Sequence, residues 1–161
     1  MKPDELYDRY GEKMYHYAAL RLGSPEDAED VLQETFCRLA RSSVRWAFVR
    51  DPKAFAFAVL RNEASRFLAR RARRREEGVS VSAGWDRLAS VIDDPADIPS
   101  AELARALAGL PDEQREVIVL KIFQDFSFKE IASVCGVSVN TAASRYRYGI
   151  EKLRARLEGK T

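Results

Sequence analysis

The chain has 161 residues, which is enough for one ordinary domain or two small ones. Its 46% hydrophobic and 32% charged residues are typical of a globular protein and exclude a disordered one. The net charge is only +2, but acidic and basic residues lie in separate segments, which is more informative than their sum. The sequence contains no secretory signal and no apolar run of about 18 residues, so we expect a cytoplasmic protein without membrane insertion.

The residue types that carry most enzyme chemistry are sparse. Cys37 and Cys135 lack CxxC spacing, and His16 has no Cys or His neighbour at metal-ligand spacing. We expect each cysteine to fill a helical core position. No Cys–His pair, glycine-rich phosphate loop or ligand cluster is found, so the sequence predicts no enzyme, no metal and no cofactor.

The first two predicted elements are helices. Residues 3–22 carry an aromatic-rich apolar stripe and end at Gly23. Ser24-Pro25 then supplies a helix cap and a first-position proline for a second helix, which extends to about residue 41. Its early exposed face is acidic without a basic residue, in Glu26, Asp27, Glu29, Asp30 and Glu34. These acids could merely stabilise the helix N-terminus; the alternative is a protein-docking face.

Residues 41–51 break the helical periodicity and predict a loop that exposes or half-buries Trp46 and Phe48. A third helix is predicted from Pro52 to about Arg75, with an apolar side formed by Phe55, Ala58, Val59, Phe67 and Leu68. Its second half is densely basic, with seven arginines against Glu63: Arg61, Arg66, Arg70, Arg71, Arg73, Arg74 and Arg75. Such a cluster repels itself unless a polyanion is present, which favours phosphate as a partner over a solvated charge run.

Residues 76–100 are rich in Gly, Pro, Ser and Asp and predict a flexible, mostly irregular linker, with a short helical turn near residues 85–92. A short helix at 100–107 follows, and a further helix begins after Leu110-Pro111 with a core of Val117, Ile118, Leu120, Ile122 and Phe123. No segment shows a strand pattern. The predicted fold class is therefore all-α, with two small helical domains joined by the linker.

The last stretch, residues 127–157, has the pattern of a helix-turn-helix. An apolar-periodic helix ends at Gly136, and Ser138 can cap a second helix. That second helix has one apolar face, while its other face carries Asn140, Thr141, Ser144, Arg145 and Arg147. This arrangement favours a recognition helix for the DNA major groove over an ordinary helical hairpin.

Three blocks together resemble the extracytoplasmic-function (ECF) type of bacterial RNA polymerase sigma factor, of the sigma-70 family. PEDAEDVLQETFCRLAR is similar to the polymerase-docking helix of sigma region 2, and DPKAFAFAVLRNEASRFLARRARRR to its −10 melting helix. LPDEQREVIVLKIFQDFSFKEIASVCGVSVNTAASRYRYGIEKLR is similar to sigma region 4, which recognises the −35 element. The resemblance implies region 2 at residues 1–76, a linker at 77–99 and region 4 at 100–161.

The resemblance also implies roles for three sets of matching positions. The polymerase-docking residues are Asp27, Asp30, Gln33 and Glu34. The −10 set is Trp46, Phe48, Arg61 and Asn62 around a flipped base, with Arg66, Arg70 and Arg71 on phosphates. The −35 set is Ser138, Asn140, Thr141, Ser144, Arg145 and Arg147.

The chain departs from the family pattern at three positions in the recognition helix. Ala143 and Tyr148 stand where members often have a cation, which predicts weaker phosphate contacts at the −35 element. Gly149 replaces a usual alanine at a cost of about 1 kcal/mol in a helix interior, and close packing against a neighbouring helix could offset that cost.

The implied partners are core RNA polymerase, through its β′ and β subunits, promoter DNA, and an anti-sigma factor where one exists. Two alternative functions stay open. The first is a helix-turn-helix regulator that binds duplex DNA without direct sigma activity, and the second is a mimic that sequesters an anti-sigma factor. Neither uses the acidic helix, the aromatic loop and the DNA-facing residues together.

Overall fold

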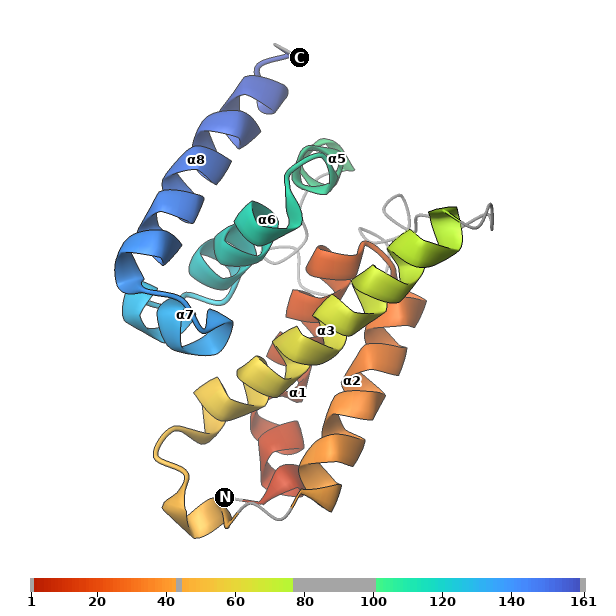
Figure 1. Ribbon diagram of the computed structural model, residues 1–161, viewed down its shortest axis with the longest axis vertical. Helices are drawn as coiled ribbons and strands as arrows, with labels where there is room; N and C mark the ends of the chain where they lie inside the picture. The colour runs from red at the N-terminus through yellow and green to blue at the C-terminus, as the bar shows by residue number, and fades with distance from the viewer. Residues whose placement is uncertain (1, 43–44, 77–100, 160–161) are drawn as a thin grey trace.

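A computed structural model describes residues 2–42, 45–76 and 101–159 of the chain. Within these ranges the chain is helical and contains no strand, which confirms the all-α class (Figure 1). The predicted linker at 77–99 and its helical turn near 85–92 lie outside the described residues. We call residues 2–76 the first lobe and residues 101–159 the second lobe; their division into independent domains stays a prediction.

The first lobe contains three long helices: α1 (Pro3–Leu22), α2 (Pro25–Arg41) and α3 (Pro52–Glu76). Gly23 adopts the left-handed conformation (φ 72°) that ends α1. The Ser24 side chain then accepts a hydrogen bond from the Asp27 amide, which begins α2 as expected. Between α2 and α3, residues Trp46–Phe48 form one turn of 3₁₀ helix, η1, where the sequence predicted only a loop.

The buried face of α3 differs from the predicted one. Phe55, Ala58, Val59, Phe67 and Leu68 are only half-buried, whereas the buried residues are Ala56, Phe57, Leu60, Glu63 and Ala64. The reason is that α3 packs against α1 and α2 on one side and against α7 of the second lobe on the other. The apolar pattern of α3 alone could not predict its contact with α7.

The second lobe contains α5 (Ala101–Ala108), α6 (Asp112–Ile118), α7 (Phe128–Cys135) and α8 (Val139–Leu157). Helix α6 continues into a π-helical turn, η2 (Val119–Phe123), where the Gln124 amide bonds to the Val119 carbonyl five residues back. Ile122 lies within this wider turn and is 49% exposed, so the prediction that it lies in the core is wrong.

Helices α6 and α8 approach closely at Gly149. A Cβ added there would lie 2.7 Å from Ile118 Cδ1 and 3.2 Å from Gln114 Cβ. The absence of a side chain therefore allows the contact between the two helices, in agreement with the expected role of this glycine.

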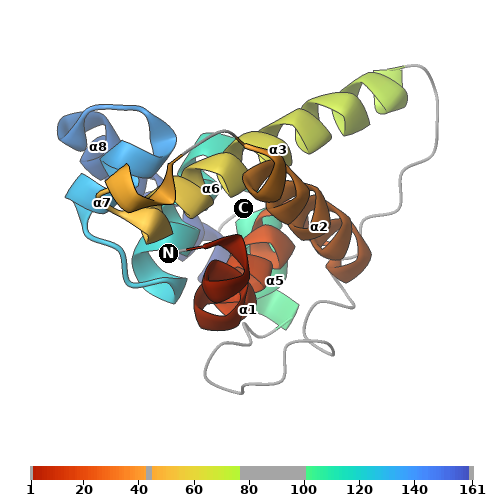
Figure 2. The same ribbon diagram turned by 90° about the horizontal axis from the view of Figure 1, so that it is seen from below.

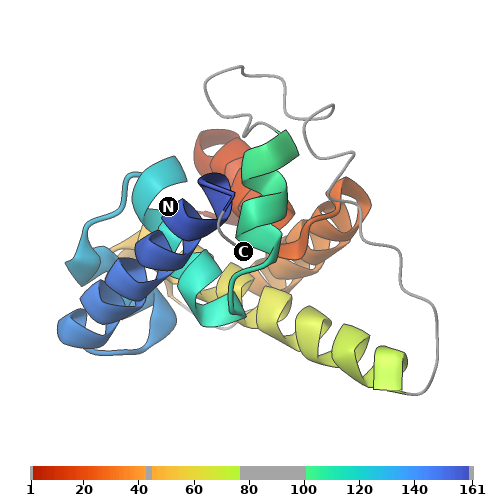
Figure 3. The same cartoon turned by 90° about the horizontal axis from the view of Figure 1, so that it is seen from above.

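The two lobes lie against each other rather than apart (Figures 2 and 3). Phe126, which precedes α7, packs edge-on against Phe57 of α3 with ring centroids 4.9 Å apart. The Lys53 ammonium lies 4.4 Å from the centre of the same Phe126 ring. One apolar core thus continues from the first lobe into the helix-turn-helix.

Candidate nucleic-acid and polymerase interfaces

The helix-turn-helix is built by local capping. Ser127 and Glu130 form a capping box at the start of α7, with bonds of 3.1 Å in both directions. Gly136 (φ 67°) ends α7, and Ser138 Oγ accepts a hydrogen bond from the Thr141 amide to begin α8. These devices fix the angle at which α8 leaves the turn.

The predicted −35 residues lie at the N-cap and in the first half of α8 and differ in exposure. Ser138, Asn140 and Arg147 are exposed, while Thr141, Ser144 and Arg145 are partly exposed. The Arg145 guanidinium lies 3.5 Å from the Glu113 carboxylate of α6. Tyr148 is 51% exposed with the Arg147 guanidinium 5.3 Å from its ring centre, and Ala143 is partly exposed.

The two aromatic residues predicted to contact the −10 element lie in different environments. Trp46 is half-buried and packs edge-on against Phe55, with ring centroids 5.5 Å apart. Phe48 is 77% exposed and free to stack. The two residues therefore offer different surfaces, one fixed against α3 and one open.

Asn62 borders a cavity of about 240 Å³ between α2 and α3. Glu63 is buried in the wall of this cavity. It forms ion pairs with Arg38 and with Arg66, the latter at 3.0 Å. The full lining is Arg38, Leu39, Ser42, Phe55, Val59, Asn62, Glu63 and Arg66. A base taken out of the stack needs such a pocket with hydrogen-bonding groups and an apolar wall. Sequence reasoning missed Arg38, Phe55 and Glu63 as lining residues, although the spacing of Phe55, Val59, Asn62 and Arg66 already placed them on one helix face.

The arginines of α3 are less uniform than expected. Arg70 is exposed, and so are Arg73, Arg74 and Arg75 at the end of the helix. Arg71, in contrast, donates to the Leu22 carbonyl at 3.0 Å and lies 3.8 Å from Asp27. Burial lowers the pKa of Arg71 from its usual value, because the charged form loses hydration. The expected self-repelling cluster is thus confined to the projecting end of the helix.

The acidic face of α2 is accessible in three of its four predicted positions. Asp30, Gln33 and Glu34 are exposed, whereas Asp27 is half-buried beside Arg71. A groove of about 980 Å³ runs beside this face, between α1 and α2. Its lining combines aromatic and acidic side chains: Tyr7, Asp8, Gly11, Glu12, Tyr15, Glu29, Asp30, Leu32, Gln33, Phe36, Cys37 and Ala40.

Comparison with known proteins matches both lobes. Residues 6–74 match the family model for sigma-70 region 2, and residues 100–153 match that for sigma-70 region 4. The ECF RNA polymerase sigma factor EcfG of Rhodopseudomonas palustris is 30% identical over 84% of this chain and 74% of its own length. The chain belongs to the ECF RNA polymerase sigma factors.

Two further relatives support this assignment. SigE of Mycolicibacterium smegmatis, also an ECF sigma factor, is 33% identical over 94% of this chain, which spans 60% of that relative's length. Among solved structures, the sigma factor RpoE in complex with the anti-sigma factor NepR, from Bartonella quintana, superposes with a TM-score of 0.72. That comparison has 27% identity and covers 96% of this chain and 95% of RpoE, so it includes both lobes.

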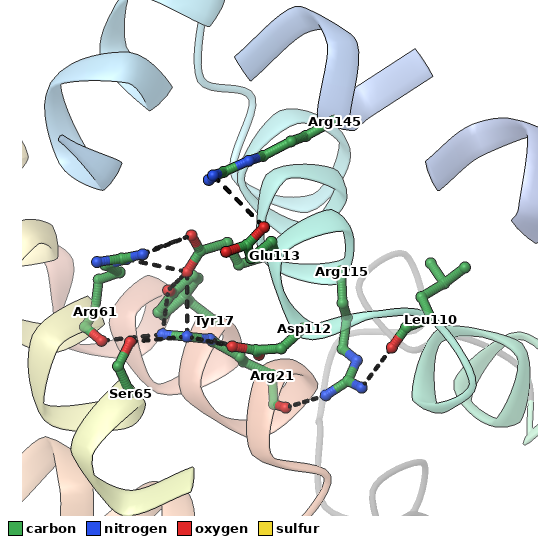
Figure 4. A network of polar contacts seen from close by, with 10 residues as sticks. Tyr17, Arg21, Arg61, Ser65, Leu110, Asp112, Glu113, Arg115 and Arg145 are labelled. Atoms are coloured by element: carbon green, nitrogen blue, oxygen red, sulfur yellow. Dashed lines mark hydrogen bonds and ion pairs between the residues drawn. The ribbon is translucent and has the colours of Figure 1, made fainter. Parts of the chain in front are cut away.

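A buried ion cluster joins the two lobes of this sigma factor (Figure 4). We define the interlobe ion cluster as Tyr17 and Arg21 of α1, Arg61 of α3, and Asp112 and Glu116 of α6. Glu116 has no exposed surface and accepts bonds from Arg61 Nε at 3.2 and 3.3 Å. Its carboxylate also lies 3.3 Å from Arg21, which in turn binds Asp112 at 2.8 Å. Arg61, a predicted −10 residue, is therefore turned toward the second lobe.

Burial at this junction raises the pKa of two of its groups. Burial raises the pKa of the Tyr17 hydroxyl well above its usual value, despite the nearby Arg21 charge. Burial beside Glu116 also raises the pKa of the Cys135 thiol to about 12. Both groups are consequently neutral at physiological pH. Cys135 fills a core position as expected, whereas Cys37 is only half-buried.

Arg115, adjacent in α6, reinforces the same junction. It is buried and donates to the carbonyls of Leu107, Ala108 and Leu110 and to that of Arg21 in α1. Sequence reasoning overlooked Arg21, Arg115 and Glu116. Arg21 lies between two leucines in an apolar stripe. This pattern could have indicated a buried ion pair, because a buried charge requires a partner.

Two candidate features are not found in the part of the chain that the structure describes. No group of three or more His, Cys, Asp or Glu side chains there could hold a metal ion. No helix in these ranges combines the length and the apolar character needed to cross a membrane.

Proposed function

We propose that this sigma factor docks on core RNA polymerase through α2 and directs transcription initiation at promoters with two recognised elements. Helix α8 recognises the −35 element, and η1 with α3 captures an unpaired −10 base. The observation that carries the proposal is the presence of three different surfaces on one chain: an acidic docking face, a base-sized pocket flanked by arginines, and a capped recognition helix.

The docking surface is the exposed part of α2. Asp30, Gln33 and Glu34 form an exposed acidic face suited to basic residues of the β′ and β subunits, since complementary charges guide association. Arg38 lies at its end, 3.7 Å from Glu34. The neighbouring groove supplies Tyr7 and Phe36, whose rings pack edge-on at 5.2 Å. Aromatic side chains are enriched at the centre of protein interfaces, and polar and charged ones lie at the rim.

The −10 surface combines base capture with phosphate binding. Phe48 offers a stacking face for the unpaired base. Asn62 hydrogen-bonds the base at the mouth of the cavity. Trp46 packs against Phe55, which lines this cavity. Arg66 and Arg70 extend along α3 to hold the strand, and Arg71 joins them when it leaves the Leu22 carbonyl. Arg61 joins this surface only when it is released from Glu116.

The −35 surface is the polar side of α8. Asn140, Thr141, Ser144 and Arg145 face the base edges, while Ser138 and Arg147 are placed for phosphates. The protein is proposed to act in the cytoplasm, where promoter DNA lies. An anti-sigma factor is a further partner, because the superposable RpoE was co-crystallised with one. We assign no enzymatic activity to the chain.

The test is in vitro transcription with core polymerase on genomic DNA, with the start sites mapped. We expect start sites that are absent with core polymerase alone and that share two sequence elements. The rival regulator, which binds duplex DNA without sigma activity, predicts tight binding to duplex by the purified protein and no new start sites. That outcome would overturn the proposal.

A further inference from the structure

The cavity between α2 and α3 differs in charge between its inside and its edge. Glu63 has only 4% of its surface exposed and lies on the inside. Its partners Arg38 and Arg66 are about half-exposed and lie toward solvent. A buried carboxylate is costly unless it is paired, and the two guanidinium groups supply that pairing. The cavity therefore has an anionic group inside and cationic groups at its edge.

The two ion pairs of Glu63 use the same oxygen. Arg66 Nη1 donates to Glu63 Oε1 at 3.0 Å, and the closest approach of Arg38 Nε is also to Oε1. This leaves Oε2 with lone pairs for an incoming donor. An ionised carboxylate accepts hydrogen bonds and cannot donate one. The cavity thus presents an acceptor at Oε2 and donors on the side of Oε1.

The other lining residues suit a flat ring that enters edge first. Leu39, Phe55 and Val59 give the cavity apolar walls, and Asn62 adds an amide. Phe55 is itself held by the edge-on contact with Trp46. An extruded base is read through the hydrogen bonds of its Watson–Crick edge, with its faces against apolar or aromatic groups. A base in this cavity would turn that edge toward Glu63.

The four bases differ in what they would present to Oε2. Cytosine and adenine carry an exocyclic amine, which donates, beside a ring nitrogen that accepts. Thymine and guanine carry a keto oxygen in place of that amine, so lone pairs would face lone pairs. The guanidinium groups beside Oε1 complement the accepting ring nitrogen of the first pair of bases. The charge pattern of the cavity therefore favours the amine-bearing edge.

We propose that Glu63 is a specificity-determining residue, which selects an unpaired −10 base with an exocyclic amine over one with a keto group. The inference rests on the proposed function, in which this cavity captures the −10 base. The alternative role for Glu63 is only to hold Arg38 and Arg66 for phosphate binding. Phosphate contacts carry no sequence information, so the two roles predict different dependence on the base.

The experiment measures binding of the full chain to single-stranded oligonucleotides by fluorescence anisotropy at one salt concentration. Oligo-dC and oligo-dU of about 12 nucleotides, a length typical of single-strand sites, share a backbone and differ in the amine and keto groups. A third oligonucleotide carries 2-pyrimidinone, which is cytosine without its amine, and a fourth is oligo-dA. The test variant is Glu63→Gln. The matched control is Glu76→Gln, which removes one negative charge from an exposed position on the same helix.

We expect the wild type to bind oligo-dC about tenfold tighter than oligo-dU or the 2-pyrimidinone oligonucleotide. In Glu63→Gln this ratio should fall to about one, because an amide donates as well as accepts. Glu76→Gln should keep the wild-type ratio. Oligo-dA binding as tight as oligo-dC assigns both bases to the cavity, and binding as weak as oligo-dU assigns cytosine alone.

Equal affinity of the wild type for oligo-dC and oligo-dU would overturn the proposal, and so would a ratio that survives in Glu63→Gln or no binding to any oligonucleotide. A loss of the same size for both would show that Glu63 only positions the arginines. Circular dichroism checks folding. If Glu63→Gln loses helicity, Glu63→Asp decides instead, because it keeps the charge but withdraws it by one methylene and should lower the ratio. These measurements need no polymerase, so failure of this inference is distinguishable from failure of the proposed function, which shows as absent start sites.

Discussion

At the scale of single residues, several side chains have a role that depends on one neighbour. Gly149 permits the contact with Ile118, Trp46 is fixed by Phe55, and Arg71 is held by the Leu22 carbonyl. Their substitutions should consequently have effects of different kinds. Stability and DNA recognition can be separated by choosing the right pair of variants.

Gly149→Ala should destabilise the second lobe. The added Cβ would lie 2.7 Å from Ile118 Cδ1, and overpacking of this kind costs about 1–3 kcal/mol, more than the gain of about 1 kcal/mol in helix propensity. The matched control is Gly11→Ala in α1, where the Cβ would meet Tyr7 at an ordinary 3.4 Å. Urea unfolding should show a lower midpoint for Gly149→Ala and an unchanged or higher one for Gly11→Ala. Equal effects would contradict the close approach of α6 and α8.

Phe48→Ala and Arg70→Ala should weaken transcription in different ways. Base contacts specify and phosphate contacts position, so Phe48→Ala or Asn62→Ala should relax preference at one −10 position, at about 1–3 kcal/mol per lost stacking contact. Arg70→Ala should lower activity on all promoters alike and reduce its salt dependence. Transcription from promoters carrying each −10 base, paired or pre-melted, measures the difference. An equal loss on every base without rescue by pre-melting would return Phe48 and Asn62 to a packing role.

At the scale of the elements, the exposed faces of the helices differ in charge. Helix α2 exposes acids, the end of α3 exposes arginines, and α8 exposes amide and hydroxyl groups. The caps at the helix ends fix where each of these helices begins and ends.

Asp30→Lys combined with Glu34→Lys should weaken binding to core polymerase, because it places like charges across the docking interface. The double control Glu102→Lys with Glu151→Lys makes the same change of net charge at exposed positions of the second lobe. Titration of labelled protein with core polymerase measures the affinity. Binding of the −35 duplex should stay unchanged, and an unaltered polymerase affinity would remove α2 from the interface.

The α7 capping box should contribute stability that depends on pH. Hydrogen bonds from Ser127 lower the pKa of the Glu130 carboxyl below its usual value, so its contribution is present above the unfolded-state pKa and is lost as the pH falls through the folded-state pKa. Ser127→Ala should cost about 1 kcal/mol at neutral pH. Thermal unfolding between pH 7 and pH 3 should show a smaller acid loss for Glu130→Gln than for the wild type. Parallel curves would show that the box contributes nothing.

The local devices could be predicted from the sequence, whereas the contacts between lobes could not. Gly23, Ser24, Gly136 and Ser138 begin and end the helices where their chemistry requires, because capping depends on neighbours in the chain. The buried face of α3 and the exposure of Ile122 were predicted wrongly. They depend on packing by a distant segment and on a π-helical turn that periodicity does not reveal.

The same distinction applies to the candidate sites. The exposed residues of α2 and α8 were found because a polar helix face is visible in the sequence. Arg61 was assigned to DNA from its position alone, and its partner Glu116 is 55 residues away. No local pattern connects two such residues.

At the scale of the whole molecule, the surfaces proposed to contact DNA are placed on lobes that pack together. The apolar contact between Phe57 and Phe126 and the interlobe ion cluster hold the same junction. The arrangement superposes on a relative crystallised with an anti-sigma factor over nearly the full length of both chains. One junction therefore holds together the two lobes that carry the proposed DNA-binding surfaces.

The central claim is that one chain specifies promoters through two separate elements on core polymerase. The most direct test maps start sites genome-wide in vitro with core polymerase and either the wild type, Asn62→Ala or Asn140→Ala. We predict that wild-type start sites share two motifs about 25 base pairs apart. Asn62→Ala should relax only the downstream motif, and Asn140→Ala only the upstream one. Start sites without a shared motif, or identical changes in both variants, would contradict the account.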